Sequence, residues 1–277
     1  SEPAISDCIF FQNTGGAGGG GGAIALHWGS NPNITNCVFS QNTAGEGGGV
    51  FCLDSDPTIT YCIFAKNEAT GFSAGGGLQG RSAHPTIINC TFTENTAITR
   101  GGGINFKYYT HAVITNCILW NDTPEEIYAE DGDPIVTYCD VQGGWTGTGN
   151  IDADPLFADT ANGDYHLSWI NFPIEDSTKS PCIDAGDPAS LLDPDSTIAD
   201  MGALYFSQEV GIREETTKPI TFYQGPTIFS GPLVLPQGKN CRIYDITGRE
   251  IDANHLLPGV YFIEVKGYII NKVIKVK

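Results

Sequence analysis

The sequence has few basic side chains. Lys and Arg together number 14 against 32 Asp and Glu, which gives a formal net charge of −18 at pH 7. The deficit lies in residues 1–206, with 5 basic and 25 acidic side chains, whereas residues 207–277 carry a net charge of +2. A surface this acidic repels nucleic acid, so we expect no nucleic-acid partner. The break in charge predicts two domains.

Long apolar runs are missing as well. None approaches the roughly 20 residues that a membrane helix needs, so no membrane insertion is expected. Ser1 opens directly into patterned sequence, without the basic and then apolar segment of an export signal, which predicts a processed, mature chain. The histidines show no zinc-ligand spacing, and the glycine tracts lack the Lys-Ser/Thr of a nucleotide-binding loop. These absences argue against zinc and nucleotide sites.

Glycine is abundant, with 35 residues, and it belongs to a repeat. A Pro-x-Ile-x-x-Cys-x-Phe unit occurs four times and is followed by two weaker copies. Its cysteines are Cys8, Cys37, Cys62, Cys90, Cys117 and Cys139, spaced by 29, 25, 28, 27 and 22 residues. Five places after each of the first four cysteines comes an asparagine (Asn13, Asn42, Asn67, Asn95), and then a glycine run. This soft period without helical periodicity predicts a parallel β-solenoid.

In a solenoid the same position of every coil stacks at about 4.8 Å, so identical residues form ladders. Cys8 and Phe10 lie two residues apart, so both are expected to point inward, and Ile5 is expected to point inward before a bend. The cysteine ladder is expected to hold buried free thiols that act as small apolar fillers. Cys52, Cys182 and Cys241 lie off this ladder, and because nine cysteines is an odd number at least one thiol stays unpaired within the chain.

The Ile-x-x-Cys-x-Phe-x-x-Asn-x-x-x-x-Gly-Gly-Gly pattern resembles the right-handed parallel β-helix repeats of bacterial polymorphic outer-membrane proteins and pectin-lyase-like surface proteins. The resemblance implies an all-β fold, with a right-handed parallel β-helix over residues 1–206. The aspartate-rich segments between residues 152 and 203 are similar to the closing turns of secreted β-helix proteins of the choice-of-anchor type. The glycine and arginine that this family usually has after its aspartate pair are absent from residues 193–197.

The end of the chain has a different pattern. Residues 207–225 are polar and unpatterned, which predicts a linker. Alternating residues over 241–249, 257–265 and 272–277 predict a small antiparallel β-sandwich. Residues 226–277 resemble the C-terminal sorting domain of proteins exported by the type IX (Por) secretion system. This resemblance implies contact with the secretion machinery and an extracellular or bacterial cell-surface location. An immunoglobulin-like cap on the solenoid is the alternative.

A cluster of aspartates could bind calcium. Five of them fall within 17 residues of turn-rich sequence: Asp184, Asp187, Asp193, Asp195 and Asp200. Oxygen ligands at this density can hold calcium. Asx-turn and capping chemistry, which needs no metal, explains the same residues. No cofactor is required, and calcium remains an option.

Catalysis lacks a recognisable motif. Resemblance to pectin-lyase-like enzymes would imply calcium-binding aspartates with a basic proton abstractor, or clustered aspartates. Arg81 and Arg100 flank glycine runs one coil apart, and Asp54 and Asp56 share one face by strand alternation. The remaining basic side chains of residues 1–206 are Lys66, Lys107 and Lys179. Neither the arginines nor the aspartates belong to a known site, so we expect a protein that is not an enzyme.

The expected function is structural. We expect an extracellular or cell-surface protein that self-assembles head to tail into filaments, through Ile5, Cys8 and Phe10 on the first coil and the C-terminal domain of a second copy. The alternative is a glycan-binding or polysaccharide-degrading β-helix. Its sugar-stacking aromatics would come from this set: Trp28, Phe72, Tyr108, Tyr109, Trp120, Trp145 and Trp169.

Overall fold

The computed structural model describes residues 3–16, 20–72, 74–208, 228–229, 241–245, 249–252, 256–265 and 268–275. The chain divides into two compact units, Ser1–Glu209 and Val210–Lys277, which we describe separately. Within the described residues, no helix has the length and apolar character needed to span a membrane.

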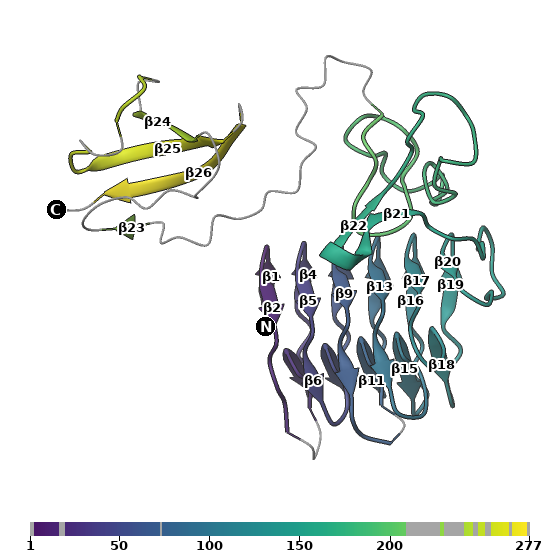
Figure 1. Ribbon diagram of the computed structural model, residues 1–277. Helices are drawn as coiled ribbons and strands as arrows, with labels where there is room; N and C mark the ends of the chain where they lie inside the picture. Colours follow the sequence, from purple (N-terminus) through teal and green to yellow (C-terminus); the bar gives the residue numbers. More distant parts are fainter. Residues whose placement is uncertain are drawn as a thin grey trace. The chain divides into compact units, whose positions relative to one another are not determined.

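The first unit is a parallel β-solenoid whose coils stack side by side from β1 to β20 (Figure 1). Sheet 1 contains β1 (Ala4–Ser6), β4 (Asn33–Thr35), β8 (Thr58–Thr60), β12 (Thr86–Ile88), β16 (Val113–Thr115) and β19 (Ile135–Thr137). Sheet 2 contains β2 (Ile9–Phe11), β5 (Val38–Ser40), β9 (Ile63–Ala65), β13 (Thr91–Thr93), β17 (Ile118–Trp120) and β20 (Asp140–Val141). The predicted all-β class with a parallel β-helix is confirmed.

Two further sheets complete the coils. Sheet 3 contains β6 (Thr43–Ala44), β10 (Glu68–Ala69) and β14 (Thr96–Ala97). Sheet 4 contains β3 (Ile24–His27), β7 (Val50–Leu53), β11 (Leu78–Arg81), β15 (Ile104–Lys107) and β18 (Ile127–Ala129). Successive coils pair in register, so Ile34 lies opposite Ile5 and Ile59. Coil length varies only between strands, and the repeat therefore survives unequal spacing.

The core consists of ladders of identical residues. The rings of Phe39, Phe64 and Phe92 stack with centroids 4.6 and 4.4 Å apart, and Phe10 extends the stack at 4.9 Å. Beside them the cysteine ladder is closely spaced, since the backbone N–H of each cysteine from Cys37 to Cys117 donates to the sulfur of the next at 3.3–3.4 Å. Eight cysteines, all but Cys241, are described as free thiols.

The corner between sheets 2 and 3 carries the asparagine ladder. The side-chain oxygen of Asn67 accepts from the backbone and amide N–H groups of Asn42 at 3.1 and 2.9 Å, and Asn67 donates in the same way to Asn95. The left-handed backbone conformation at this corner belongs to the residue before each asparagine, such as Gln41 or Lys66. The asparagine instead holds neighbouring corners together through its amide.

Glycine is required where coils approach most closely. A Cβ on Gly48 would lie 2.3 Å from the carbonyl oxygen of Gly76, and one on Gly76 would lie 2.2 Å from that of Gly102. Real Cβ atoms do not approach backbone oxygens this closely, so the glycine runs hold the turn between sheets 3 and 4 in a compact form.

The coils end earlier than expected. Sheet 2 ends at β20, and Ile151 adds a single bridge to Asp140. Residues 152–208, which we call the closing segment, include β21 (Phe157–Asp159), the 3₁₀ helix η1 (Thr160–Asn162) and β22 (Asp164–Leu167). The closing segment lacks the repeat unit and does not add coil strands to the sheets, so the β-helix ends before residue 206, although the compact unit continues to Glu209.

The closing segment folds back along the outer face of sheet 2. Tyr165 and Ala203 pack on Ile63 and Ala65 of β9, and Trp169 and Met201 belong to a cluster around Ile118 of β17. Figure 1 shows the β21–β22 hairpin at this side of the coils. The closing segment thus shields the outward-facing apolar side chains of sheet 2 from water.

The second unit contains one four-stranded sheet in its described residues. Its strands are β23 (Ile228–Phe229), β24 (Cys241–Asp245), β25 (Gly259–Val265) and β26 (Tyr268–Lys275). The pairs β24–β25 and β25–β26 are antiparallel, as the alternation predicted, whereas β23 pairs parallel to β26. A second layer of the expected sandwich is not among the described residues, and the predicted linker lies outside them except for residues 207 and 208.

Candidate functional site

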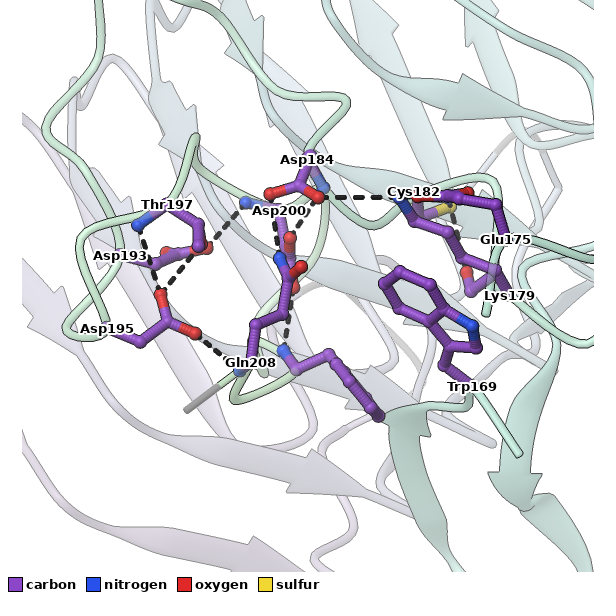
Figure 2. A network of polar contacts seen from close by, with 12 residues as sticks. Trp169, Glu175, Lys179, Cys182, Asp184, Asp193, Asp195, Thr197, Asp200 and Gln208 are labelled. Carbon is purple, nitrogen blue, oxygen red and sulfur yellow. Dashed lines mark hydrogen bonds and ion pairs between the residues drawn. The ribbon is translucent and has the colours of Figure 1, made fainter. Parts of the chain in front are cut away.

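The aspartates of the closing segment form a polar network (Figure 2). Both carboxylate oxygens of Asp200 accept backbone N–H groups at 2.7 Å, one from Asp184 and one from Phe206. Asp193 accepts the N–H of Asp200 at 2.8 Å, and Asp195 accepts that of Gln208 at 2.6 Å. These carboxylates hold irregular backbone in place where no strand partner satisfies it.

The hydrogen bonds favour turn chemistry over a metal. Asp187 accepts the N–H of Ala189, and Asp195 accepts both the N–H and the hydroxyl of Thr197, which are Asx-turn contacts. Within the described ranges, no group of three or more His, Cys, Asp or Glu side chains is arranged to hold a metal ion. Asx-turn contacts are therefore present at Asp187 and Asp195.

Lys179 lies at the other end of this network. Its ammonium group lies 3.0 Å from Glu175, 3.5 Å from Asp184 and 4.4 Å from the ring centre of Trp169. Trp169 is buried and packs within the closing segment, so its ring is not accessible for stacking on a sugar.

A pocket of 550 Å³ lies between the closing segment and the corner that joins sheets 1 and 2. Its coil side is formed by Asn36, Tyr61 and Asn89, which occupy equivalent corner positions with φ of 53°, 52° and 48°. On its other side lie residues 191–194 and 202–205, together with Asp200 and His166. Sequence reasoning missed this pocket because it depends on how the closing segment folds back.

Arg81 and Arg100 each contact partners of their own. Arg81 Nη2 lies 2.8 Å from Glu46 Oε2, and the guanidinium lies 5.9 Å from the ring centres of Phe51 and Tyr108. Arg100 lies 4.6 Å above the ring of Tyr128. Each arginine therefore packs on its own aromatic partners on the outer side of sheet 4.

The two other lysines of the coils are also engaged. Lys66 pairs with Glu94 at 3.4 Å and donates to the carbonyl of Thr160 in the closing segment. Lys107 pairs with Glu130 at 3.7 Å. All five basic side chains of residues 1–206 thus contact an acidic or aromatic partner.

The predicted aspartate pair serves the backbone as well. Asp56 Oδ1 accepts the N–H of His84 at 2.6 Å, one coil further on, and Asp54 occupies a left-handed corner position with φ of 49°. Asp56 thus holds the backbone of the next coil.

The family follows from these coils. The model of the right-handed β-helix region matches residues 1–78 and 47–149, which together make up more than half of the chain. The chain belongs to the right-handed β-helix family. No curated protein and no solved structure matches it. The closing segment and the second unit lie beyond the β-helix match.

In this β-helix the asparagine ladder ends on a carboxylate that sequence reasoning missed. Asp122 Oδ1 accepts the backbone and amide N–H groups of Asn95 at 2.6 and 2.9 Å. Asp122 stands five places after Cys117, so the spacing that located the asparagines could have located it as well. The backbone N–H of Asp122 donates to Glu126 Oε1 at 3.1 Å.

The Asp122–Glu126 pair is buried and incompletely satisfied. Asp122 is 6% and Glu126 4% exposed, and the second oxygen of each carboxyl has no hydrogen-bond partner. Burial raises the pKa of Glu126 to about 7. Burial and the neighbouring Glu126 raise the pKa of Asp122 well above its usual value. One shared proton would satisfy both free oxygens.

A second buried acid joins the last coil to the closing segment. Asp140 accepts the N–H of Ala153 at 3.1 Å and the thiol of Cys182 at 3.2 Å, and burial raises its pKa to about 6. Burial also raises the pKa of the Cys182 thiol, which is therefore protonated and unreactive at neutral pH.

The residues predicted for assembly and for sugar stacking differ in exposure. Ile5 and Phe10 are partly buried against the core, whereas Cys8 is exposed. Among the aromatic candidates, those on the surface are Trp28, Phe72, Tyr108 and Tyr109. Trp120 and Trp145 are partly buried against apolar clusters, so the seven aromatics do not form one strip.

Proposed function

We propose that this β-helix protein is a non-enzymatic structural protein of the cell exterior. The observation that supports the proposal is the engagement of all five basic side chains of residues 1–206. β-Helix lyases of the pectin-lyase-like type would need a basic residue free to abstract a proton, within hydrogen-bond reach of a substrate. Arg81, for example, is paired with Glu46 and packed on two aromatic rings.

The ladders support the scaffold role. Each coil is joined to the next by backbone pairing, stacked phenylalanines and asparagine amides, and these contacts repeat without interruption from the first coil to Asn95. Nearest-neighbour contacts of this kind produce a stiff rod with regular outer surfaces. Stiffness and a regular surface suit a structural protein that bridges a distance or covers a surface, rather than an enzyme.

The experiment is a depolymerisation assay. The protein is incubated with neutral and acidic polysaccharides, and reducing ends and unsaturated products are measured. We expect no product above the buffer blank. Product formation that is lost in Arg81→Ala and kept in Lys66→Ala would overturn the proposal and restore the polysaccharide-degrading alternative.

Assembly and location form the finer part of the proposal. Export by the type IX route and a bacterial surface location rest on the resemblance of residues 226–277, and filament formation rests on the charge difference between residues 1–206 and 207–277. Electron microscopy of native material is expected to show filaments or a surface layer, and Ile5→Asp is expected to abolish them. Intact mass of the native protein is expected to include the second unit; a mass ending near residue 206 would make that unit an export tag.

Glycan binding has one observation in its favour. Trp28 and Tyr108 occupy the same corner column, three coils apart, and are 81% and 52% exposed. Exposed aromatic faces stack on sugar rings. Pull-down on insoluble polysaccharides, with Trp28→Ala as the variant, would detect this activity.

A further inference from the structure

The pocket beside Tyr61 has the size and lining of a ligand site. Its volume of 550 Å³ lies within the range of about 300–1,000 Å³ that is typical of small-molecule sites. Apolar and aromatic side chains dominate one side, with Leu191, Leu192, Tyr61 and Tyr205 exposed by 88, 59, 46 and 40%. Apolar side chains gathered around a hollow in this way are typical of surfaces that bind something.

The polar side of the pocket is acidic. Asp193 and Asp200 line it, and Asp184 and Asp195 lie next to them in the same network (Figure 2). The lining contains no Lys or Arg, and its one histidine, His166, is paired with Asp164 at 2.6 Å. Lys179 binds Glu175 and Asp184 and is not part of the lining. Burial raises the pKa of Asp200 to about 7 and also raises the pKa of Asp193 above its usual value. Where these carboxyl groups are ionised, no Lys or Arg within the pocket balances their charge.

Tyr61 is an unusual choice for its position. The corner column comprises Asp7, Asn36, Tyr61, Asn89, Asn116 and Tyr138, all with φ between 48° and 54°. Asp and Asn adopt the left-handed region far more readily than other non-glycine residues. Tyr138 is accounted for by packing in the cluster around Ile118, whereas Tyr61 is exposed and faces the pocket. A positive φ recurs at the corners of successive coils, so it is the exposed ring of Tyr61 at the pocket wall that suits a binding role.

We infer that this pocket binds an organic cation, a primary ammonium group on a short apolar stem. The charge complementarity comes from Asp193, whose Oδ2 holds one N–H group and whose carboxylate retains further acceptor capacity toward an ammonium group. The faces of Tyr61 and Tyr205 attract a cation through their π electrons. Leu191 and Leu192 offer apolar contact to the stem. An anionic ligand would meet uncompensated carboxylates.

The test uses n-butylammonium chloride and n-butanol, which share a stem and differ in charge. Binding is measured at pH 7 by chemical-shift changes or calorimetry on the full chain. We expect butylammonium to bind at least about tenfold more tightly than butanol, because the ion gains the carboxylate and ring contacts. Asp193→Asn keeps the acceptor for the Asp200 N–H and removes the charge, so it is expected to weaken butylammonium by about fivefold or more.

Tyr61→Asn provides a variant that is safe for folding, because asparagine suits the corner better than tyrosine. It is expected to weaken butylammonium several-fold. Tyr109→Asn is the matched control: Tyr109 also has a positive φ, of 60°, is 74% exposed and is not in the lining. Equal affinity for butanol, saturable binding of methyl glucoside in place of butylammonium, an equal effect of Tyr109→Asn, or no saturation by butylammonium would each overturn the inference. The inference does not depend on the scaffold role.

Discussion

Replacing Asp122 with asparagine tests how the end of the ladder is built. Asparagine would continue the column of Asn13, Asn42, Asn67 and Asn95, keeping an oxygen for the N–H groups of Asn95. Its amide would place a donor where Asp122 Oδ2 now lacks a partner beside Glu126. The variant also removes one of two carboxyl groups that cannot both ionise when buried side by side.

The pH dependence of the free energy of unfolding follows from the raised pKa of Glu126. Its pKa rises from 4.5 to about 7, because burial penalises the ionised form. A raised acid pKa means that the folded state holds the proton more tightly than the unfolded state. This contribution to stability is fully present below pH 4.5 and is lost as pH rises through 7, a loss on the order of 3 kcal/mol. Asp122, also raised, adds to the loss in the same direction.

Asp122→Asn removes the titration of Asp122, whose pKa burial and Glu126 raise, so we expect the loss of stability between pH 5 and pH 8.5 to be smaller than in the wild type, while the part due to the burial of Glu126 remains. Urea unfolding followed by tryptophan fluorescence measures it, since all four tryptophans lie in the first unit. Asp131→Asn, an exposed carboxylate of the next loop, is the control and is expected to keep the wild-type slope. Wild-type stability that rises over this pH range, or an unchanged slope in Asp122→Asn, would refute the reasoning.

Three further predictions follow from the ladders and the closing segment. Asn67→Ala is expected to cost about 3 kcal/mol in urea unfolding, because it removes four hydrogen bonds from a fully buried amide, whereas Asn13→Ala, at an exposed end, is expected to cost about 1 kcal/mol or less. Thiol titration of the native protein is expected to modify Cys8 rapidly and the other described cysteines only after unfolding; fewer than six free thiols in the denatured protein would contradict the cysteine ladder. Millimolar calcium or a chelator is expected to leave the melting temperature unchanged, since the carboxylates of residues 184–200 already accept N–H groups; a shift of several degrees would restore calcium binding.

The repeat could be predicted because its determinants are local. The spacing of Cys37 and Phe39, with Asn42 after them, specifies which side chains point inward and where each coil bends, and stacking repeats the same solution. Register needed no further information, because a slip by one residue would bring the inward phenylalanines to the surface. Asp122 follows the same spacing rule, with aspartate in place of asparagine.

The closing segment could not be predicted in this way. Its position depends on contacts that are distant in sequence, such as the hydrogen bond from Asn89 to the carbonyl of Asp200 and that from the N–H of Ala203 to Thr91. Its composition resembles further coils, yet the aspartates serve single turns and no pattern repeats. The Tyr61 pocket lies between a coil corner and the closing segment, so neither sequence segment alone predicts it.

The unequal coil lengths have an evolutionary consequence. Cysteine spacings between 22 and 29 residues coexist with unbroken strand register. The pairing of strands is therefore independent of the length of the loops between them. A coil can therefore be gained, lost or enlarged at one loop while every other coil keeps its neighbours. The number of coils sets the length of the solenoid, and the loops set its surface. Selection can therefore change the length without changing the loops, or change the loops at a constant length.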